Sequence, residues 1–362
     1  AHAHRARAKD FLMRPVFYLF SVDGADLTDT LMDRVTRLTV VDAEGLASDT
    51  LEVELDDRGQ RIPLPAAGDR LRLLLGYLER PPVPTIGDFV VDEVRLSGPP
   101  LTVSFSAKGA DMVRTSVKAP RIDAGDDDTL DKLARRIAQR QGLEPHIHPD
   151  AAHIPIGHID QQGESDMALL TRVARARDWV LRLDGERLTL RPHASNLPPA
   201  RQAAPWRPPI HRIDARQIAR YDYTTNARSR YGKVRSWYYD HDTGRRVPVE
   251  VSDGESDGPA LDLRHDARDE QSALDLATAR LRQLRRASGG LTLELPGDTR
   301  LLAGHHVLVT GLSEPIGGQW VIERAEHTLD ASGLKTRIEC VPPSAGGRAG
   351  KDLTDSILEE VE

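Results

Sequence analysis

Two stretches of the chain carry three similar segments in the same order, and this internal repeat constrains the fold more than any other feature. The corresponding segments are residues 51–55 with 291–295, 67–73 with 303–309, and 86–92 with 316–323. They combine alternating aliphatic residues with glycine turns, which is typical of β-strands. We therefore expect two similar small β domains. The alternative is that two unrelated β domains share these features, because alternation and glycine turns occur in many folds.

If the repeat is real, equivalent residues should occupy equivalent positions in the two cores. Side chains alternate between the two faces of a strand, so every second residue of a matched segment should point inward. The structural anchors expected on this basis are Leu51, Val53, Leu55 and Phe89 in the first domain, and Leu291, Leu293, Leu295 and Trp320 in the second. Two such domains in one chain suit a ring-forming assembly protein better than an enzyme.

Between the β regions lies a segment with helical periodicity. Apolar residues recur at i, i+3, i+4 and i+7 after the acids 126–128, at Leu130, Leu133, Ala134 and Ile137. This spacing predicts a helix that ends at Gly142. A second helix is expected after the cap Ser165-Asp166, followed by strands at 179–183 and 187–190. These elements predict a small α+β unit.

Changes in sequence pattern along the chain predict the following organisation. Residues 1–12 form a leader or added segment, and Met13 is expected to be the natural start. The later segments are a first β domain at 13–112, an α+β insertion at 113–195, a proline-rich linker at 196–209, a second β domain at 210–343 with a helix near 266–287, and a flexible tail at 344–362. The helix is expected to bury Leu274, Ala277, Leu281 and Leu284.

Composition excludes several classes of protein. The 49 basic and 56 acidic side chains give a formal charge of −7, and aromatic residues are 4% of the chain. This argues against sequence-specific nucleic-acid binding, which needs basic and stacking surfaces. No apolar run is long enough for a membrane-spanning helix, so we expect a soluble protein without a membrane partner. The single cysteine, Cys340, fits a reducing compartment and a buried, unreactive role.

The densest group of possible metal ligands lies in a histidine-rich segment. His146, His148 and His153 are the weak candidates, with Asp150 and His158 nearby. The prolines of this segment indicate a loop, so we expect a solvated or interface loop and no metal. His305-His306 is a poorer candidate, because neighbours on a strand point to opposite faces.

Two other motifs resemble known ligand-binding loops but lack an essential residue. The acidic loop at 253–258 lacks the glutamate of a calcium loop and has Arg264 in its place, and the glycine-rich 345–351 is followed by Asp352 where a phosphate loop has serine or threonine. The arginines that end the third helix, at 280, 282, 285 and 286, are expected to form salt bridges. We therefore expect no catalytic residues and no cofactor. A tail-associated cell-wall hydrolase is the alternative function.

The order of several motifs is similar to a known family. The segments at 14–17, 22–28, 48–57 and 86–94, with QGESDMALLTR at 162–172 and WVIERAEH at 320–327, resemble the late control protein D family. Members are baseplate hub proteins of contractile phage tails, and they are similar to the hub portion of the VgrG spike of type VI secretion. The resemblance covers residues 13–343.

The resemblance implies a fold and a role. The fold class is mixed α+β and mainly β: two similar tube-like β-barrel domains bracketing a small α+β unit. The implied protein is a structural baseplate hub, a homotrimer whose ring has pseudo-sixfold symmetry and adapts the sixfold tail tube to the threefold spike. The expected partners are a separate spike protein, tail tube or tube-initiator proteins and baseplate wedge proteins. The expected location is the virion tail baseplate, or a tailocin or other injection particle, assembled in the bacterial cytoplasm.

The repeat also predicts how such a ring would close. A small β domain exposes two sheet edges that a soluble protein must cover. Two similar domains per chain can pair edge to edge around a closed ring, where three chains supply six units. The ring should enclose a lumen with a polar wall.

Overall fold

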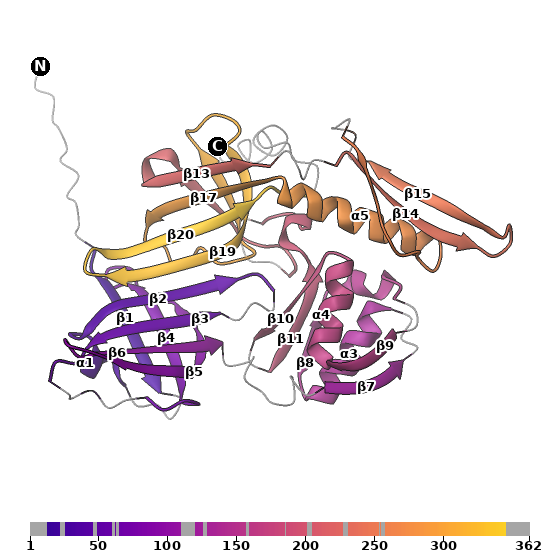
Figure 1. Cartoon of the computed structure of the whole chain (residues 1–362). Coiled ribbons are helices and arrows are strands. Elements are labelled where there is room, and N and C mark those ends of the chain that lie inside the picture. The colour runs from indigo at the N-terminus through magenta and orange to yellow at the C-terminus, as the bar shows by residue number, and fades with distance from the viewer. Residues whose placement is uncertain are drawn as a thin grey trace, which may run out of the picture.

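The chain is mainly β-structure, arranged in one large sheet and three smaller ones within its described part (Figure 1). The structure is a computed structural model. It describes residues 13–21, 26–45, 49–59, 62, 65–109, 120–125, 129–156, 159–184, 186–200, 205–226, 231–252, 254 and 258–344. The predicted segment 1–12, all of the predicted tail 344–362 except Ser344, and the motifs at 126–128 and 345–351 lie outside these residues. None of the described helices is long and apolar enough to cross a membrane.

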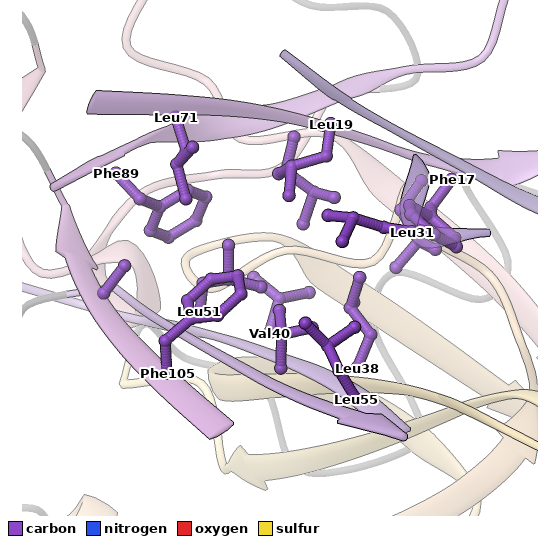
Figure 2. Packing of buried hydrophobic residues seen from close by; sticks show 14 of the residues in the cluster. Phe17, Leu19, Leu31, Leu38, Val40, Leu51, Leu55, Leu71, Phe89 and Phe105 are labelled. Carbon is purple, nitrogen blue, oxygen red and sulfur yellow. The ribbon is translucent and has the colours of Figure 1, made fainter. Parts of the chain in front are cut away.

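The first β region is a six-stranded antiparallel sheet. Its strands are β1 (Pro15–Ser21), β2 (Val35–Ala43), β3 (Thr50–Asp56), β4 (Arg70–Tyr77), β5 (Thr85–Ser97) and β6 (Thr102–Gly109). They lie in the order β1-β4-β5-β6-β3-β2. The sheet curls around a core that also includes Leu31 of α1 (Thr28–Leu31), and Figure 2 shows Leu51 and Val40 facing Leu71 and Leu19 across its interior.

The second β region repeats this order. Its strands are β12 (Ile210–Asp214), β13 (Arg220–Thr225), β17 (Gly289–Pro296), β18 (His306–Thr310), β19 (Gly318–Asp330) and β20 (Gly333–Val341). They lie in the order β12-β18-β19-β20-β17-β13, which matches the first region strand for strand. The difference is at one edge, where β12 runs parallel to β18 while β1 runs antiparallel to β4.

The two β regions form one continuous sheet. Strand β2, at the edge of the first region, pairs antiparallel with β19 of the second region, so that twelve strands share one hydrogen-bonded network. Two separate closed barrels, as expected from the sequence, are not seen among the described strands. The physical reason is that an unpaired edge is stabilised by any complementary edge, and here each region supplies the other with one.

The α+β unit has its own core. It contains β7 (Pro120–Gly125), α3 (Leu130–Gln141), β8 (Glu144–Ile147), β9 (Ile159–Ser165), α4 (Asp166–Ala176), β10 (Trp179–Asp184) and β11 (Arg187–Pro192). Thr129 caps α3, Gly142 ends it in the left-handed conformation that glycine adopts without strain, and Ser165 caps α4. The apolar face predicted for α3 is buried in this core, and so are Met167, Leu170 and Ala174 of α4.

A helix and a small sheet extend from the second β region (Figure 1). Helix α5 (Glu270–Ala287) packs on β14 (Lys233–Asp240) and β15 (Arg245–Ser252), and β16 (Ala260–Asp262) pairs with β14. The helix begins at Glu270, later than the expected 266, because Asp269 caps it. Ala277, Leu281 and Leu284 are buried as expected, but Leu274 is 40% exposed, which corrects the predicted face.

Candidate functional site

The joint between β2 and β19 is the most distinctive feature of the molecule. Leu38 lies opposite Leu329, Val40 opposite His327, and Thr39 opposite Thr328. Leu38, Val40 and His327 are essentially fully buried. On the other face, the hydroxyl oxygens of Thr39 and Thr328 are 3.4 Å apart. The joint therefore carries a row of mostly apolar, buried side chains on one face and a polar pair on the other.

The two halves of the sheet agree in register as well as in strand order. Leu51 pairs with Ala107 and Val53 with Phe105 in the first half. At the matched positions of the second half, Leu291 pairs with Cys340 and Leu293 with Ile338. The ladder of β5 with β6 is interrupted between Val91 and Glu93, and that of β19 with β20 between Ile322 and Arg324. A bulge at equivalent positions is a shared structural feature that chance does not readily produce.

All eight anchor residues are buried. Leu51, Val53, Leu55 and Phe89 are at most 1% exposed in the first core, and Leu291, Leu293, Leu295 and Trp320 at most 6% in the second. Phe89 pairs with Leu71 on β4, and Trp320 pairs with Val307 on β18. The two aromatic residues therefore occupy the same place in the two ladders.

The counterparts of the two strands that form the joint, β13 for β2 and β5 for β19, have open edges among the described strands. Strand β13, the counterpart of β2, ends the sheet and pairs with β17 alone among the described strands. The second half of β5, the counterpart of the part of β19 that binds β2, pairs with β6 alone within the described residues. Tyr221 on β13 is 48% exposed and Leu96 on β5 is 54% exposed. Both are large apolar residues at strand edges that pair with no other described strand.

The face of the sheet opposite the core is polar. A groove of about 290 Å³ follows β2, β3, β5 and β6, and its lining includes Arg37, Thr39, Glu52, Glu54, Glu93 and Arg95. The same face continues across the second half, where Arg337 lies 3.7 Å from Glu294. Strand alternation explains this pattern, because the residues between the buried anchors must face the other side.

Two acidic groups fix the α+β unit against the joint. Arg182 of β10 donates to Asp42 Oδ1 of β2 and to Asp49 Oδ2, each at 3.0 Å. Asp42 Oδ2 also accepts the backbone N–H of Ala303, in the second β region, at 2.8 Å. Burial raises the pKa of Asp49 to about 7, although the charge of Arg182 opposes this rise. Asp42 thus contacts all three parts of the chain.

A second buried network lies beside the first. Arg286, at the end of α5, forms an ion pair with Asp178 of the α+β unit, and its Nη1 donates to Ser195 Oγ at 3.2 Å. Ser195 Oγ lies 2.8 Å from Ser344 Oγ. Asp178 adopts a left-handed backbone with φ of 63°, which costs energy for a residue other than glycine. The ion pair with Arg286 stabilises this conformation.

Glu44 extends the network from the end of β2. Its Oε1 accepts the N–H of Ala194 at 3.1 Å and lies 3.0 Å from Arg191 Nη1. Its Oε2 lies 3.2 Å from Nε2 of His193. Burial, reinforced by the charge of Arg286, lowers the pKa of His193 to about 3, so this histidine is neutral at pH 7. No local motif connects these residues, so they could not be predicted from the sequence.

The histidine candidates do not form a metal site within the described residues, where no group of three possible ligands converges. The rings of His146 and His148 pack on Trp206, at centroid distances of 4.3 and 5.0 Å. His153 ends the short 3₁₀ turn Pro149–His153, and His158 lies outside the described residues. His146 and His148 therefore pack the proline-rich segment 196–209, which carries Trp206, against the α+β unit.

The other residues singled out from the sequence, where they are described, pack against neighbouring groups of the fold. The ring of His305 stacks on His211, whereas His306 is buried and lies 3.0 Å from the carbonyl oxygen of Ala194. Cys340 lies in the second core, where burial raises its pKa far above the ordinary value. Most of the acidic loop at 253–258 lies outside the described residues.

His327 should make the joint sensitive to acid. Burial lowers its pKa from 6.5 to about 4, although the charges of Asp42 and Asp298 oppose this shift. Because the folded state favours neutral imidazole, the unfolded chain takes up a proton first as the pH falls below 6.5. Stability is therefore lost between pH 6.5 and about 4, by about 3 kcal/mol for this one group.

The variant His327→Leu tests this expectation. Leucine is chosen because the bulge shared by the two ladders aligns His327 of β19 with Leu96 of β5. We expect the unfolding free energy of the variant to fall less than that of the native chain between pH 6.5 and 4, by about 3 kcal/mol. Denaturant titrations at a series of pH values measure the difference. Equal losses in both proteins would contradict the assignment.

The architecture is a phage tail protein fold. The 43 kDa tail protein of prophage MuSo2 from Shewanella oneidensis superposes with a TM-score of 0.69 at 17% identity, covering 91% of this chain and 99% of that chain. A component of the Escherichia coli type VI secretion system, the c3393 protein, superposes with a TM-score of 0.56 at 9% identity, over 85% of this chain and 73% of that chain. At these identities the likeness establishes the fold.

Sequence comparison gives the family. The model of the phage tail baseplate hub (GPD) family matches residues 127–333, more than half of the chain. The chain belongs to this family, and the resemblance predicted from its motifs is confirmed. A probable baseplate hub protein of Escherichia phage 186 is 35% identical over 162 residues, which are 45% of this chain and 41% of that protein. The chain thus covers about two fifths of the length of this relative.

Proposed function

We propose that the chain forms a homotrimeric ring of pseudo-sixfold symmetry in the baseplate hub of a contractile tail. The observation that carries this proposal is the repeated six-stranded sheet, with the same strand order in both halves and the same register where β3 pairs with β6 and β17 with β20. The two halves are joined edge to edge within the chain. Three chains would supply six such units, and pairing around a closed ring would cover the free edge of β13 and that of the second half of β5 in every chain.

A ring of this kind suits the junction between parts of different symmetry. A sixfold tail tube would meet six similar β units, and a threefold spike would meet three identical chains. We infer that the partners are tube or tube-initiator proteins on one side, a spike protein on the other, and wedge proteins around the rim. The polar face that carries Glu52, Glu54 and Arg37 would line the lumen.

The role is structural rather than catalytic. The buried charged groups beside the joint are ion-paired across the contacts between the three parts of the chain, as in Asp42 with Arg182 and Asp178 with Arg286. Such pairs position domains. We do not propose the cell-wall hydrolase alternative, because no observation favours it.

The copy number of the chain tests the proposal. We expect light scattering of the concentrated protein to give three times the mass of one chain, and images of the assembled particle to place three copies around the tail axis. A particle with six copies, or with this protein away from the axis, would contradict the proposed function.

A further inference from the structure

We propose that β13 of one chain pairs antiparallel with the second half of β5 of the next chain, in the register that joins β2 to β19 within each chain. This interface rests on the proposed ring and specifies its contacts. The partner is a second copy of the chain, because the two open edges are the counterparts of the two edges already joined. Each chain would offer one edge to each neighbour.

The repeat determines which residues of β13 correspond to those of β2. Leu38 pairs with Val53 and Tyr221 pairs with Leu293, at matched positions of β3 and β17. By the same comparison, Val40 pairs with Leu51 and Tyr223 pairs with Leu291. Leu38 and Val40 thus correspond to Tyr221 and Tyr223, and Thr39 corresponds to Asp222.

The corresponding residues of β5 follow from its ladder with β6. Beyond the shared bulge, Val94–Phe105 and Ala325–Ile338 are matched pairs. Two residues further along each ladder, Leu96 pairs with Val103 and His327 pairs with Thr336 on β20. Leu96 therefore corresponds to His327 and Ser97 to Thr328. Transferring the internal register places Leu96 opposite Tyr223 and Ser97 opposite Asp222 of the neighbouring chain.

The apolar side of this interface explains two exposed residues. Leu96 and Tyr221 project on the core face of the sheet, yet 54% and 48% of their surfaces are exposed. In the proposed register they become diagonal neighbours across the new strand pair, close enough for an aromatic ring to cover an aliphatic side chain. The matched internal residues, Leu38 and His327, are both fully buried. Pairing would thus extend the core from one chain to the next.

The polar side is compatible with the same register. Ser97 would face Asp222, as Thr328 faces Thr39 in the internal joint. Arg95, on the same face as Ser97, would lie diagonal to Asp222, and opposite charges at this spacing attract. Pro99 follows Gly98 and has no backbone N–H, so the ladder would end where β5 itself ends at Ser97.

A pair of cysteines tests the register. In the double variant Ser97→Cys/Asp222→Cys, the two side chains would face each other between chains, within reach of a disulfide. Cys340 is buried and should not interfere. We expect oxidation of the concentrated protein to produce covalent dimers and trimers on non-reducing gels, with the trimer as the largest species and reversal by a reductant.

Two matched variants serve as controls. Thr39→Cys/Thr328→Cys should form its disulfide within one chain and leave the mass unchanged. Leu96→Cys/Asp222→Cys uses neighbouring positions whose side chains project to opposite faces, so we expect no covalent trimer.

The outcomes separate this interface from the proposed function. If the internal pair closes and Ser97→Cys/Asp222→Cys forms no bond between chains, the edge pairing is wrong. If the protein is nevertheless trimeric by light scattering, the proposed ring stands without this interface. Covalent species that grow beyond three chains would support the edge pairing and contradict the trimeric ring. Equal cross-linking in Leu96→Cys/Asp222→Cys would overturn the register.

Discussion

Replacing Arg286 with methionine is expected to lower the free energy of unfolding by about 3–5 kcal/mol, because it leaves a buried carboxylate without its counter-charge. Arg286 is 9% exposed and its partner Asp178 is 4% exposed. The guanidinium also donates to Ser195 and so connects the second β region to the α+β unit. Denaturant unfolding monitored by tryptophan fluorescence measures the loss.

The exposed pair Arg72–Asp88 provides the control. It has the same two-pronged geometry, with distances of 2.6 and 2.7 Å, but its side chains are 56% and 41% exposed. Arg72→Met should cost less than about 1 kcal/mol, because water screens this pair. The double variant Asp178→Asn/Arg286→Met should recover part of the loss. Equal costs for Arg286→Met and Arg72→Met would show that the buried network contributes little.

Replacing Phe89 or Trp320, the aromatic anchors of the two repeats, with alanine is expected to lower the free energy of unfolding by a similar amount. Phe89→Ala and Trp320→Ala each remove an aromatic side chain that is at most 3% exposed, and such cavities cost about 3–5 kcal/mol. Trp320 also loses the hydrogen bond from its Nε1 to the carbonyl oxygen of Ile316. Thermal and denaturant unfolding measure both variants.

Tyr239→Ala is the matched control for these two variants, because this aromatic residue is 47% exposed on β14. A change within about 0.5 kcal/mol is expected there. A large loss of unfolding free energy in Phe89→Ala beside a small loss in Trp320→Ala would contradict this expectation. The two residues would then contribute differently to the stability of the two cores.

The local elements could be predicted because their causes are local. Alternation at Leu51, Val53 and Leu55 indicates a strand with one buried face, whatever strand lies beside it. Gly142 ends helix α3 as its sequence predicts, whereas the cap at the other end is Thr129, the residue after the acids 126–128 that the sequence offered for this role. The α5 boundary was wrong by four residues, since Asp269 provides the cap and the sequence offers several acids as candidates.

The repeat predicted more than local structure, because two copies of one pattern must solve the same packing problem. The matched ladders of Leu51 with Ala107 and Leu291 with Cys340 illustrate this outcome. The sequence could not indicate that β12 runs parallel to β18, since alternation along a strand does not depend on the direction of its neighbour. Nor did it indicate the sheet of β14, β15 and β16 that packs on α5.

The amino-acid sequence alone thus determined the repeated strands of the two β regions, the two longer helices of the α+β unit, the duplication and, through the order of its motifs, the family. The tertiary structure decided which edges meet and which charges are buried. Strand β2 pairs with β19 across most of the chain length, and Glu44, Asp178 and Arg286 converge from three parts of it. Partner choice at a sheet edge depends on which edges the fold leaves open, and the burial of a charge depends on what surrounds it. Neither property is encoded in the residues adjacent in sequence.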